Sequence, residues 1–276
     1  MAAERHSPVA IRQSLVRLGH LCFDDFLLLR KWGLSRESAS FEGLSPFSPE
    51  LTSDWALALN NAPHVLRHME ATGCRLPIVS ARPCPSMSSI ASAQTRLVGR
   101  FAYDLLRAKA PPLYDALPWH DWDFSIVTKR FPLWKTRFLL AGDGTTVAIC
   151  RCRKSAGVYA LEPDETIARY IERKAALEKV RRVRVLHSSL SPSLPLPSSS
   201  VDLAVVGSSP ALETGHWKLV TQELLRISSN ILLVENSPLC PPLDDKALAD
   251  VQFRPASVEV RGLGQRRCWW LSSDGT

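Results

Sequence analysis

The sequence predicts an α/β protein in which a helical region of about 130 residues precedes a mostly parallel β-sheet that closes with an antiparallel hairpin. Three observations predict this fold. Apolar residues recur at three- and four-residue steps in the first third of the chain, as on one face of a helix. From about residue 136, short β-rich runs alternate with amphipathic stretches, which is typical of parallel strands joined by crossover helices. Two final β-rich runs flank a glycine turn, a hairpin signal.

Length and composition are those of a globular protein of one or two domains. The 276 residues are 45% hydrophobic and 22% charged, which excludes general disorder, a coiled-coil rod and a disulfide-rich miniprotein. No stretch approaches about 18 uninterrupted apolar residues, so we expect no membrane-spanning helix. We divide the chain into residues 1–130, a helical cap or substrate-binding region, and residues 131–276, a sheet domain.

Cysteine spacing and the amino-terminal residues bear on the compartment. The seven cysteines lack the regularity of a disulfide framework, and nothing near Cys150 and Cys152 completes a zinc site. We therefore expect buried thiols, no metal and a cytoplasmic location. Arg5, Arg12 and Arg17 resemble the basic residues of a mitochondrial transit segment, so a mitochondrial location stays open.

The net charge of +7 favours anionic partners without identifying one. The basic residues form only short runs in the sequence, such as Lys179–Arg184 and Arg261–Arg267. Nucleic-acid binding needs them gathered on one face with aromatic residues between them. We interpret both runs as solvated surface, and a nucleic-acid partner, though possible, has no support from the sequence alone.

Three helices are expected in the helical region, with starts marked by capping side chains and ends by glycine or proline. The first has an apolar register that continues without a break into residue 29, which favours a folded helix over a transit segment. The expected helices are Ile11–Leu29, a second from a cap at Ser53 or Asp54 to Gly73 with a kink or break at Pro63, and a third from Ile90 to Leu106 that Pro111 and Pro112 end.

Seven short β-rich runs are expected to form the sheet. They are Arg137–Ala141, Val158–Leu161, Val183–Leu186, Val201–Val206, Ile231–Val234, Ser257–Arg261 and Arg267–Leu271, with a turn at Gly262–Gly264. Because single helices separate the first five runs, we expect these five strands to lie parallel.

The first expected strand continues directly into a glycine turn, Gly142-Asp143-Gly144, at the expected start of a helix. Two glycines let the backbone turn sharply and approach a ligand without a Cβ in the way. Glu162 follows the next expected strand, where a carboxylate can accept hydrogen bonds from both hydroxyls of a ribose. This order of strand, turn, helix, strand and acid indicates a nucleoside-binding site.

The same segment has a second interpretation. Asp143-Gly144 lies between two apolar, β-branched runs, Phe138–Ala141 and Thr146–Cys150, and is also typical of a β-hairpin with a type I′ turn. The later alternation of strands and helices favours the crossover helix, because an antiparallel start would disturb it.

Residues 137–271 resemble the Rossmann-like domain of the class I S-adenosylmethionine-dependent methyltransferases. The glycine turn resembles the first motif of that family, Glu162 its ribose-binding acid, and Val201–Val206 its fourth strand. The closing hairpin matches the two strands that separate this family from plain dinucleotide binders. The resemblance implies a seven-stranded sheet in which the last strand is inserted antiparallel.

The resemblance also implies S-adenosylmethionine as the cofactor. The residues that would hold it are Gly142, Asp143, Gly144 and Glu162, with Ser188 and Ser189 near the adenine. The first motif is degenerate, because Leu140 stands where the family commonly has an acid and Thr146 replaces the third glycine. After the third strand, His187 precedes two serines where the family often has an acid.

Three residues are candidates for catalysis. His120 and Asp123 precede the first strand, and a histidine flanked by carboxylates can act as an acid or base. A packed tryptophan pair with a polar rim is the other interpretation of that segment. Ser208 follows the fourth strand and would either line the transfer site or cap a loop. Residues 207–210 lack the Asn/Asp-Pro-Pro-aromatic pattern expected for methylation of planar amino nitrogens.

We therefore expect a methyltransferase whose partner is a small-molecule or protein methyl acceptor, with no membrane partner. Two other functions stay open. The departures in the first motif favour a non-catalytic scaffold or partner subunit of the same fold. The G-x-G turn and Glu162 also suit a nicotinamide-dependent oxidoreductase, although the closing hairpin disfavours it.

Overall fold

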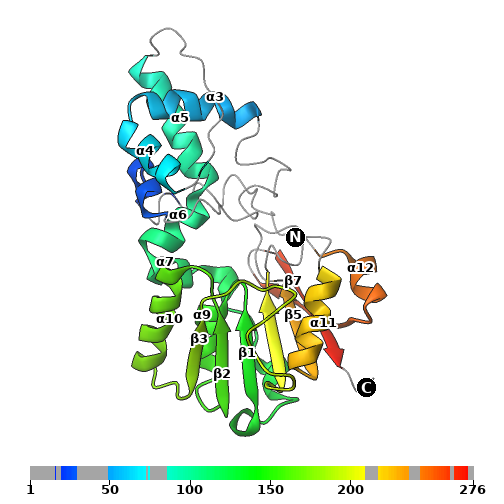
Figure 1. The fold of residues 1–276 in the computed structure, drawn as a ribbon. Helices are drawn as coiled ribbons and strands as arrows, with labels where there is room; N and C mark the ends of the chain where they lie inside the picture. The colour runs from blue at the N-terminus through cyan, green and yellow to red at the C-terminus, as the bar shows by residue number, and fades with distance from the viewer. Residues whose placement is uncertain are drawn as a thin grey trace. The chain divides into compact units, whose positions relative to one another are not determined.

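The computed structural model describes residues 16, 20–29, 49–72, 74, 86–208, 217–235, 243–261 and 264–272. The chain forms two compact units, one of His6–Tyr114 and one of Met1–Arg5 with Asp115–Thr276. The first unit is helical and the second contains a seven-stranded sheet (Figure 1). In the described part of the chain, no helix is long and apolar enough to cross a membrane.

The helical unit packs around a cluster of aromatic rings. The rings of Phe26, Trp55 and Phe101 lie with centroids 5.2 to 5.8 Å apart and are fully buried. Aromatic side chains of this size bury more apolar area than any others, so this cluster is the centre of the unit's core. The elements around it are the 3-10 helix η1 (Phe23–Leu28), α3 (Pro49–Asn60), α4 (Pro63–Ala71), α5 (Met87–Arg100) and α6 (Ala102–Lys109); α7 (Pro111–Asp115) follows.

The first predicted helix is wrong for residues 20–29. His20 has a left-handed backbone conformation (φ +47°), and Cys22 is extended. The Asp25 carboxylate accepts a hydrogen bond from the Cys22 amide (2.7 Å), so a separate short helix, η1, starts there. The preceding part of the prediction, residues 11–15 and 17–19, lies outside the described residues.

The second predicted helix starts earlier than its expected caps. α3 begins at Pro49, so Ser53 and Asp54 lie inside the helix, and neither caps it. Asp54 instead accepts two hydrogen bonds from Arg96 of α5, at 2.6 and 2.9 Å. The break expected at Pro63 is confirmed, because proline is tolerated at the first position of a new helix, here α4.

The third predicted helix is two helices. Ser86 caps α5, and the helix breaks at Phe101, whose ring is held in the aromatic cluster. α6 ends at Lys109, before Pro111 as expected, and Pro111 then opens α7. Gly73, which was expected to end the second helix, lies outside the described residues.

The sheet has the strand order β3-β2-β1-β4-β5-β7-β6. Strands β1 to β5 pair parallel, and β7 lies antiparallel between β5 and β6. The mostly parallel seven-stranded sheet with an inserted antiparallel strand is therefore confirmed, and it is the topology of the class I methyltransferases. The strands are β1 (Arg137–Ala141), β2 (Gly157–Leu161), β3 (Val183–Leu186), β4 (Leu203–Gly207), β5 (Asn230–Glu235), β6 (Arg254–Arg261) and β7 (Gly264–Ser272).

The hairpin interpretation of the glycine turn is excluded. β1 pairs on both sides with parallel strands, and residues Thr145–Arg151 form a helix, α9. β4 starts two residues later than predicted, because Asp202 accepts hydrogen bonds from the amide and guanidinium of Arg137 (2.7 to 3.2 Å) and the chain bends there. Val201 is left with an isolated bridge to Ser228.

Helices cover both faces of the sheet (Figure 1). Successive strand residues point to opposite faces, so Leu139 and Leu140 face different layers. Leu139 packs in a cluster with Leu224 of α11, whereas Leu140 faces Ala148 of α9. The helices of this unit are η2 (Pro118–His120), α8 (Ser125–Thr128), η3 (Leu133–Lys135), α9 (Thr145–Arg151), α10 (Glu165–Leu177), α11 (Trp217–Ile227) and α12 (Asp245–Asp250).

Candidate functional site

The glycine turn has the backbone conformation that its sequence predicts. β1 ends at Ala141 and α9 begins at Thr145, so three residues join the strand to the helix. Gly142 and Gly144 both have positive φ, +77° and +80°. Residues with a side chain rarely adopt this conformation, so glycine is required at both positions.

The turn packs against the end of β4 through backbone atoms. The Asp143 amide donates a hydrogen bond to the Ser208 carbonyl oxygen at 3.0 Å. A Cβ placed on Gly142 would lie 2.6 Å from the carbonyl oxygen of Gly207. A Cβ placed on Gly207 would lie 2.0 Å from that of Asp143. Gly207 is therefore as necessary for this arrangement as the turn glycines, and sequence reasoning did not identify it; a glycine ending an apolar strand was the available signal.

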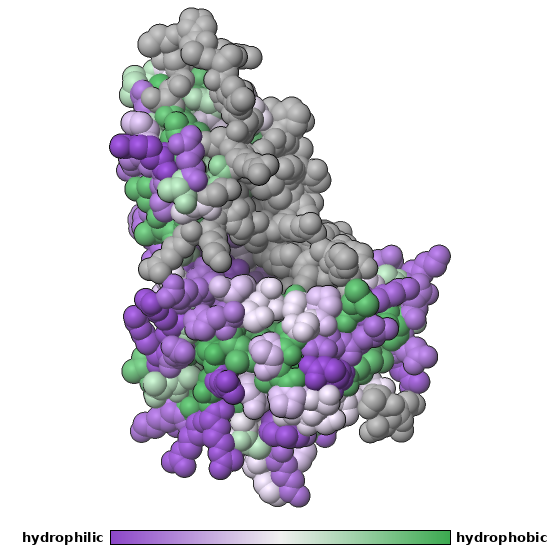
Figure 2. Space-filling view, in the orientation of Figure 1, coloured by the Kyte–Doolittle hydropathy of each residue, from purple (hydrophilic) through white to green (hydrophobic). Residues whose placement is uncertain are grey.

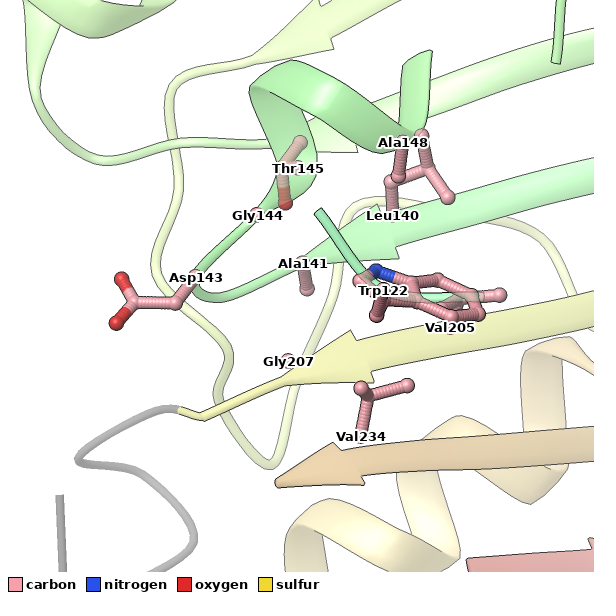
Figure 3. A pocket seen from close by; sticks show the side chains of 10 residues that line it. All are labelled: Trp122, Leu140, Ala141, Asp143, Gly144, Thr145, Ala148, Val205, Gly207 and Val234. Carbon is pink, nitrogen blue, oxygen red and sulfur yellow. The ribbon is translucent and has the colours of Figure 1, made fainter. Parts of the chain in front are cut away.

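A small pocket lies at the turn, where the neighbours of β1 change from β2 to β4 (Figure 3). In open parallel sheets, ligands bind at such switch points beyond the carboxyl ends of the strands. The empty space is about 190 Å³, including space open to solvent. The described residues that line it are Trp122, Leu140, Ala141, Asp143, Gly144, Thr145, Ala148, Val205, Gly207 and Val234.

Trp122 supplies the aromatic wall of the pocket. It comes from the segment before β1, and its indole lies over the strands beside Leu140 and Val205 (Figure 3). Phe124 supports it at a centroid distance of 5.1 Å and in turn packs on Phe138 of β1. The sequence suggested a packed tryptophan pair here but did not place Trp122 at the site.

Glu162 lies beside the glycine turn. Ala141 pairs with Leu161, so the next residue of each strand brings Gly142 and Glu162 to the same edge. The Glu162 side chain is buried, and its Oε1 accepts a hydrogen bond from the Asp164 amide at 2.9 Å. Asp164 itself caps α10, so the acid sits on an ordered turn.

Ser188 and Ser189 follow β3, on the far side of β2 from the glycine turn. The Leu186 carbonyl accepts a hydrogen bond from the Glu162 amide (3.0 Å), which keeps this loop near Glu162. Ser188 is half-buried and its hydroxyl donates to the Ser189 carbonyl (3.1 Å), while Ser189 is exposed. Neither serine belongs to the described lining of the pocket. Their role toward an adenine stays a prediction.

The three catalytic candidates lie around the pocket but not among its described lining residues. His120 is fully buried, with its ring edge-on to Trp119 at 6.1 Å. Asp123 accepts hydrogen bonds from the amide (2.9 Å) and hydroxyl (2.7 Å) of Ser125 and so starts α8. Ser208 is buried where it follows β4. Ser209 and His216 lie outside the described residues.

The two departures from the family motif face different surroundings. Leu140, in place of the acid, is an apolar wall of the pocket. Thr146, in place of the third glycine, is buried in the first turn of α9, and its hydroxyl has no hydrogen-bond partner among the described residues. A buried polar group without a partner costs about 1–3 kcal/mol, so a bound polar ligand or water there would stabilise the site.

The described cysteines are free thiols, as expected. Cys74, Cys152 and Cys268 are buried, Cys150 is half-buried, and Cys22 is exposed, which contradicts the expectation that all are buried. Burial raises the pKa of the Cys152 thiol and that of Cys74, the latter to about 11. Within the described ranges, no group of three or more His, Cys, Asp or Glu side chains could hold a metal ion.

No protein-family model matches the chain, and no curated protein matches it. Solved structures do. A SAM-dependent methyltransferase from Aquifex aeolicus is 20% identical over 55% of this chain and 89% of that chain, with a TM-score of 0.41. Magnesium protoporphyrin IX methyltransferase from Synechocystis PCC 6803 with bound SAM is 14% identical over 53% and 73%, with a TM-score of 0.40. A geranyl diphosphate methyltransferase in complex with SAM is 15% identical over 62% and 90%, with a TM-score of 0.42.

Proposed function

We propose that this protein is an S-adenosylmethionine-dependent methyltransferase that acts on a small molecule or a protein side chain. One observation carries the proposal. The positive-φ glycine turn, Gly142 to Gly144, and the buried carboxylate of Glu162 lie side by side at the switch point of a 3-2-1-4-5-7-6 sheet. A turn without side chains admits a ligand to the backbone, and an adjacent carboxylate is a hydrogen-bond acceptor for a ribose.

The residues present fit such a cofactor. An ionised carboxylate has about four acceptor sites, so Glu162 can hold the Asp164 amide and still accept from ribose hydroxyls. The space of about 190 Å³ is below the ~300–1,000 Å³ of small-molecule sites, so a bound cofactor would also cover the edge formed by Gly142 and Glu162.

S-adenosylmethionine supplies a methyl group on a sulfonium cation, which is transferred by in-line displacement. The chain's own residues bind and orient the reactants. Glu162 and the glycine turn fix the nucleoside, while Leu140, Val205 and Val234 exclude water from the pocket. Trp122 presents its indole there, and aromatic faces attract cations. Ser208, His120 and Asp123 are the candidates that would position the acceptor or remove its proton.

A second function is favoured by the small size of the pocket. With Trp122 lying over β1 and β4, the present space suits a non-catalytic protein that keeps the fold as a scaffold or partner subunit. The oxidoreductase alternative is disfavoured by the antiparallel insertion of β7, since plain dinucleotide-binding sheets lack that hairpin.

Calorimetric titration of the full chain with S-adenosylmethionine, S-adenosylhomocysteine, NAD and NADP separates the three functions. For a methyltransferase, the first two bind and the last two do not. Glu162→Gln retains an acceptor for the Asp164 amide but removes the charge, and we expect it to weaken binding about tenfold, which corresponds to ~1.4 kcal/mol.

Glu165→Gln is the matched control. Glu165 is also acidic and only three residues away, but its side chain is solvent-exposed and pairs with Arg169 on the surface of α10. It should leave binding unchanged. Binding of a dinucleotide alone would overturn the proposal in favour of an oxidoreductase, and no binding at millimolar concentrations would overturn it in favour of a scaffold.

A further inference from the structure

We propose that the amino-terminal edge of β1, β2 and β3 is a binding surface for single-stranded nucleic acid. This edge lies at the opposite end of the strands from the glycine turn, so the proposal does not depend on the proposed function. We call it the basic edge. It comprises Lys129, Arg130, Trp134, Lys135, Arg137, Arg153, Lys154, Lys179, Arg181 and Arg182.

The fold gathers these residues from three segments that are far apart in the sequence. The Ala156 amide, before β2, donates to the Thr136 carbonyl before β1 (2.9 Å). The Arg182 guanidinium, before β3, donates to the Ala156 carbonyl (3.2 Å). The three connections that enter β1, β2 and β3 are thus joined by hydrogen bonds into one continuous surface. In Figure 2, hydrophilic side chains gather at the lower end of the view, where Figure 1 shows these strands beginning.

The basic edge accounts for the whole excess charge of the chain. It carries nine lysines and arginines, all exposed, and the acids among them are Glu178 and Asp202, which leaves a net charge of +7. The chain as a whole has a net charge of +7, so the remaining residues sum to zero. Asp202 is committed to an ion pair with Arg137. A positive field concentrated on one surface attracts polyanions.

An exposed indole lies within this charge. The side chain of Trp134 is 67% exposed, whereas each of the other six described tryptophans is buried or half-buried. The Lys135 ammonium lies 4.5 Å from its ring centroid. Unpaired bases stack on exposed aromatic side chains and phosphates pair with the surrounding cations, which is how sequence-tolerant sites hold single strands.

Two basic side chains occupy positions where the backbone favours glycine. Lys179 and Arg182 have φ of +55° and +59°, the left-handed region that costs a side chain about 1–2 kcal/mol. Lys179 makes no side-chain hydrogen bond or ion pair among the described residues, so no interaction within the fold offsets that cost. A bound phosphate would.

The combination favours a single strand over other polyanions. A duplex covers both faces of its bases, so Trp134 would have nothing to stack on. An acidic protein would use the charge but not the indole. An anionic membrane surface would require an amphipathic helix with a broad apolar face, whereas here one indole stands among nine cations.

Fluorescence anisotropy of the full chain with labelled oligonucleotides of about 12 nucleotides tests the proposal. The probes are single-stranded RNA, single-stranded DNA of the same sequence, and the corresponding duplex. We expect the single strands to bind more tightly than the duplex, and the comparison of RNA with DNA identifies the source of the strand. Polyglutamate and anionic phospholipid vesicles serve as competitors, and each should compete poorly.

Two sets of variants separate charge from stacking. The triple variant Arg153→Ala, Lys154→Ala, Lys179→Asn should reduce the slope of log affinity against log salt by about 2, at ~0.7 for each phosphate that is no longer neutralised. Asparagine tolerates positive φ, so this variant should fold normally. Trp134→Ala should weaken binding about tenfold without changing the salt slope, since stacking contributes ~1–3 kcal/mol per base.

Exposed residues elsewhere in the same unit provide the controls. Lys218→Ala with Lys246→Ala removes two exposed charges, and Leu177→Ala removes an exposed apolar side chain. These should leave binding unchanged. The proposal is overturned if the controls weaken binding as much as the variants of the basic edge, if polyglutamate or vesicles compete as well as RNA, or if no probe binds below about 100 µM at ~100 mM salt.

Discussion

The Asp143 amide and the Ser208 carbonyl oxygen, 3.0 Å apart, fasten the glycine turn after β1 to the residue that follows β4. Neither side chain takes part in this hydrogen bond. The two segments can come this close only because glycines face each other across the contact, Gly142 from the turn and Gly207 from the strand. The position of the candidate cofactor site is therefore set by backbone contact between two strand ends.

Gly207→Ala should be among the most destabilising substitutions in the sheet unit. Its Cβ would meet the Asp143 carbonyl oxygen at 2.0 Å, and backbone cannot give way without moving the turn. We expect a loss of about 3 kcal/mol in the free energy of unfolding, measured by urea denaturation. Gly157→Ala is the control, because its nearest neighbour would be the Arg182 carbonyl oxygen at an ordinary 3.7 Å. Equal losses for both variants would contradict the backbone-contact interpretation.

Trp122 should report ligand binding directly. Its indole forms a wall of the pocket, so a bound sulfonium would quench its fluorescence. We expect addition of S-adenosylmethionine to quench the tryptophan emission of the protein, and Trp122→Phe to abolish most of that change. Trp134→Phe removes an equally large emitter away from the pocket and should leave the quenching intact. Quenching that persists in Trp122→Phe would place the ligand elsewhere.

Glu223 should stabilise the protein only above acidic pH. Hydrogen bonds from the Arg226 guanidinium hold the pKa of the Glu223 carboxyl below its ordinary value of 4.5, and the Leu194 amide adds another at 2.6 Å. An acid with a lowered pKa in the folded state stabilises the fold above its ordinary pKa. That stability is lost as the pH falls through the folded-state pKa.

Glu223→Gln should therefore cost about 2 kcal/mol near pH 7. The difference from the unmodified protein should shrink as the pH is lowered from about 5 toward 3, because the carboxyl of the unmodified protein is then protonated too. Urea denaturation across this range measures the effect. Glu165→Gln, which removes an exposed ion pair with Arg169, should cost no more than about 0.5 kcal/mol at any pH. A pH-independent cost for Glu223→Gln would show that its carboxyl does not titrate as described.

The sequence located the strands well because each is an apolar run bounded by turn residues. β1 and β3 have the predicted bounds, Arg137–Ala141 and Val183–Leu186, and the glycine turn leads into a helix as expected. Helix boundaries in the first third were predicted less well, because tertiary contacts decide them. Asp54 was expected to cap a helix and instead lies inside α3, paired with Arg96.

What the sequence could not supply is proximity between distant segments. Gly207 faces the glycine turn only because β4 lies next to β1, and Trp122 reaches the pocket only because Phe124 anchors its segment on the sheet. Lys154 and Lys179 look like isolated surface charges until parallel pairing brings the starts of β2 and β3 together. Single-sequence periodicity identifies elements, but which of them are neighbours follows from the strand order.

Asp115 and Lys174 should behave as a coupled pair. The Asp115 carboxylate is 10% exposed and contacts the Lys174 ammonium, and it also accepts a hydrogen bond from the Tyr170 hydroxyl at 3.1 Å. Lys174→Met should cost about 3 kcal/mol, because it leaves a buried carboxylate without its cation. The double variant Asp115→Asn, Lys174→Met should recover most of that loss. Additive losses in the double-mutant cycle would show that the two side chains do not interact.

The insertion of β7 between β5 and β6 has a consequence for the order in which the sheet is assembled. β6 leaves the ribosome before β7, yet its hydrogen-bonded neighbour in the sheet is β7. A nascent chain that has just released β6 therefore exposes β5 as an open edge, with β6 unable to close it. Arrest of synthesis at that stage would leave an unprotected strand, the kind of template on which nascent chains associate.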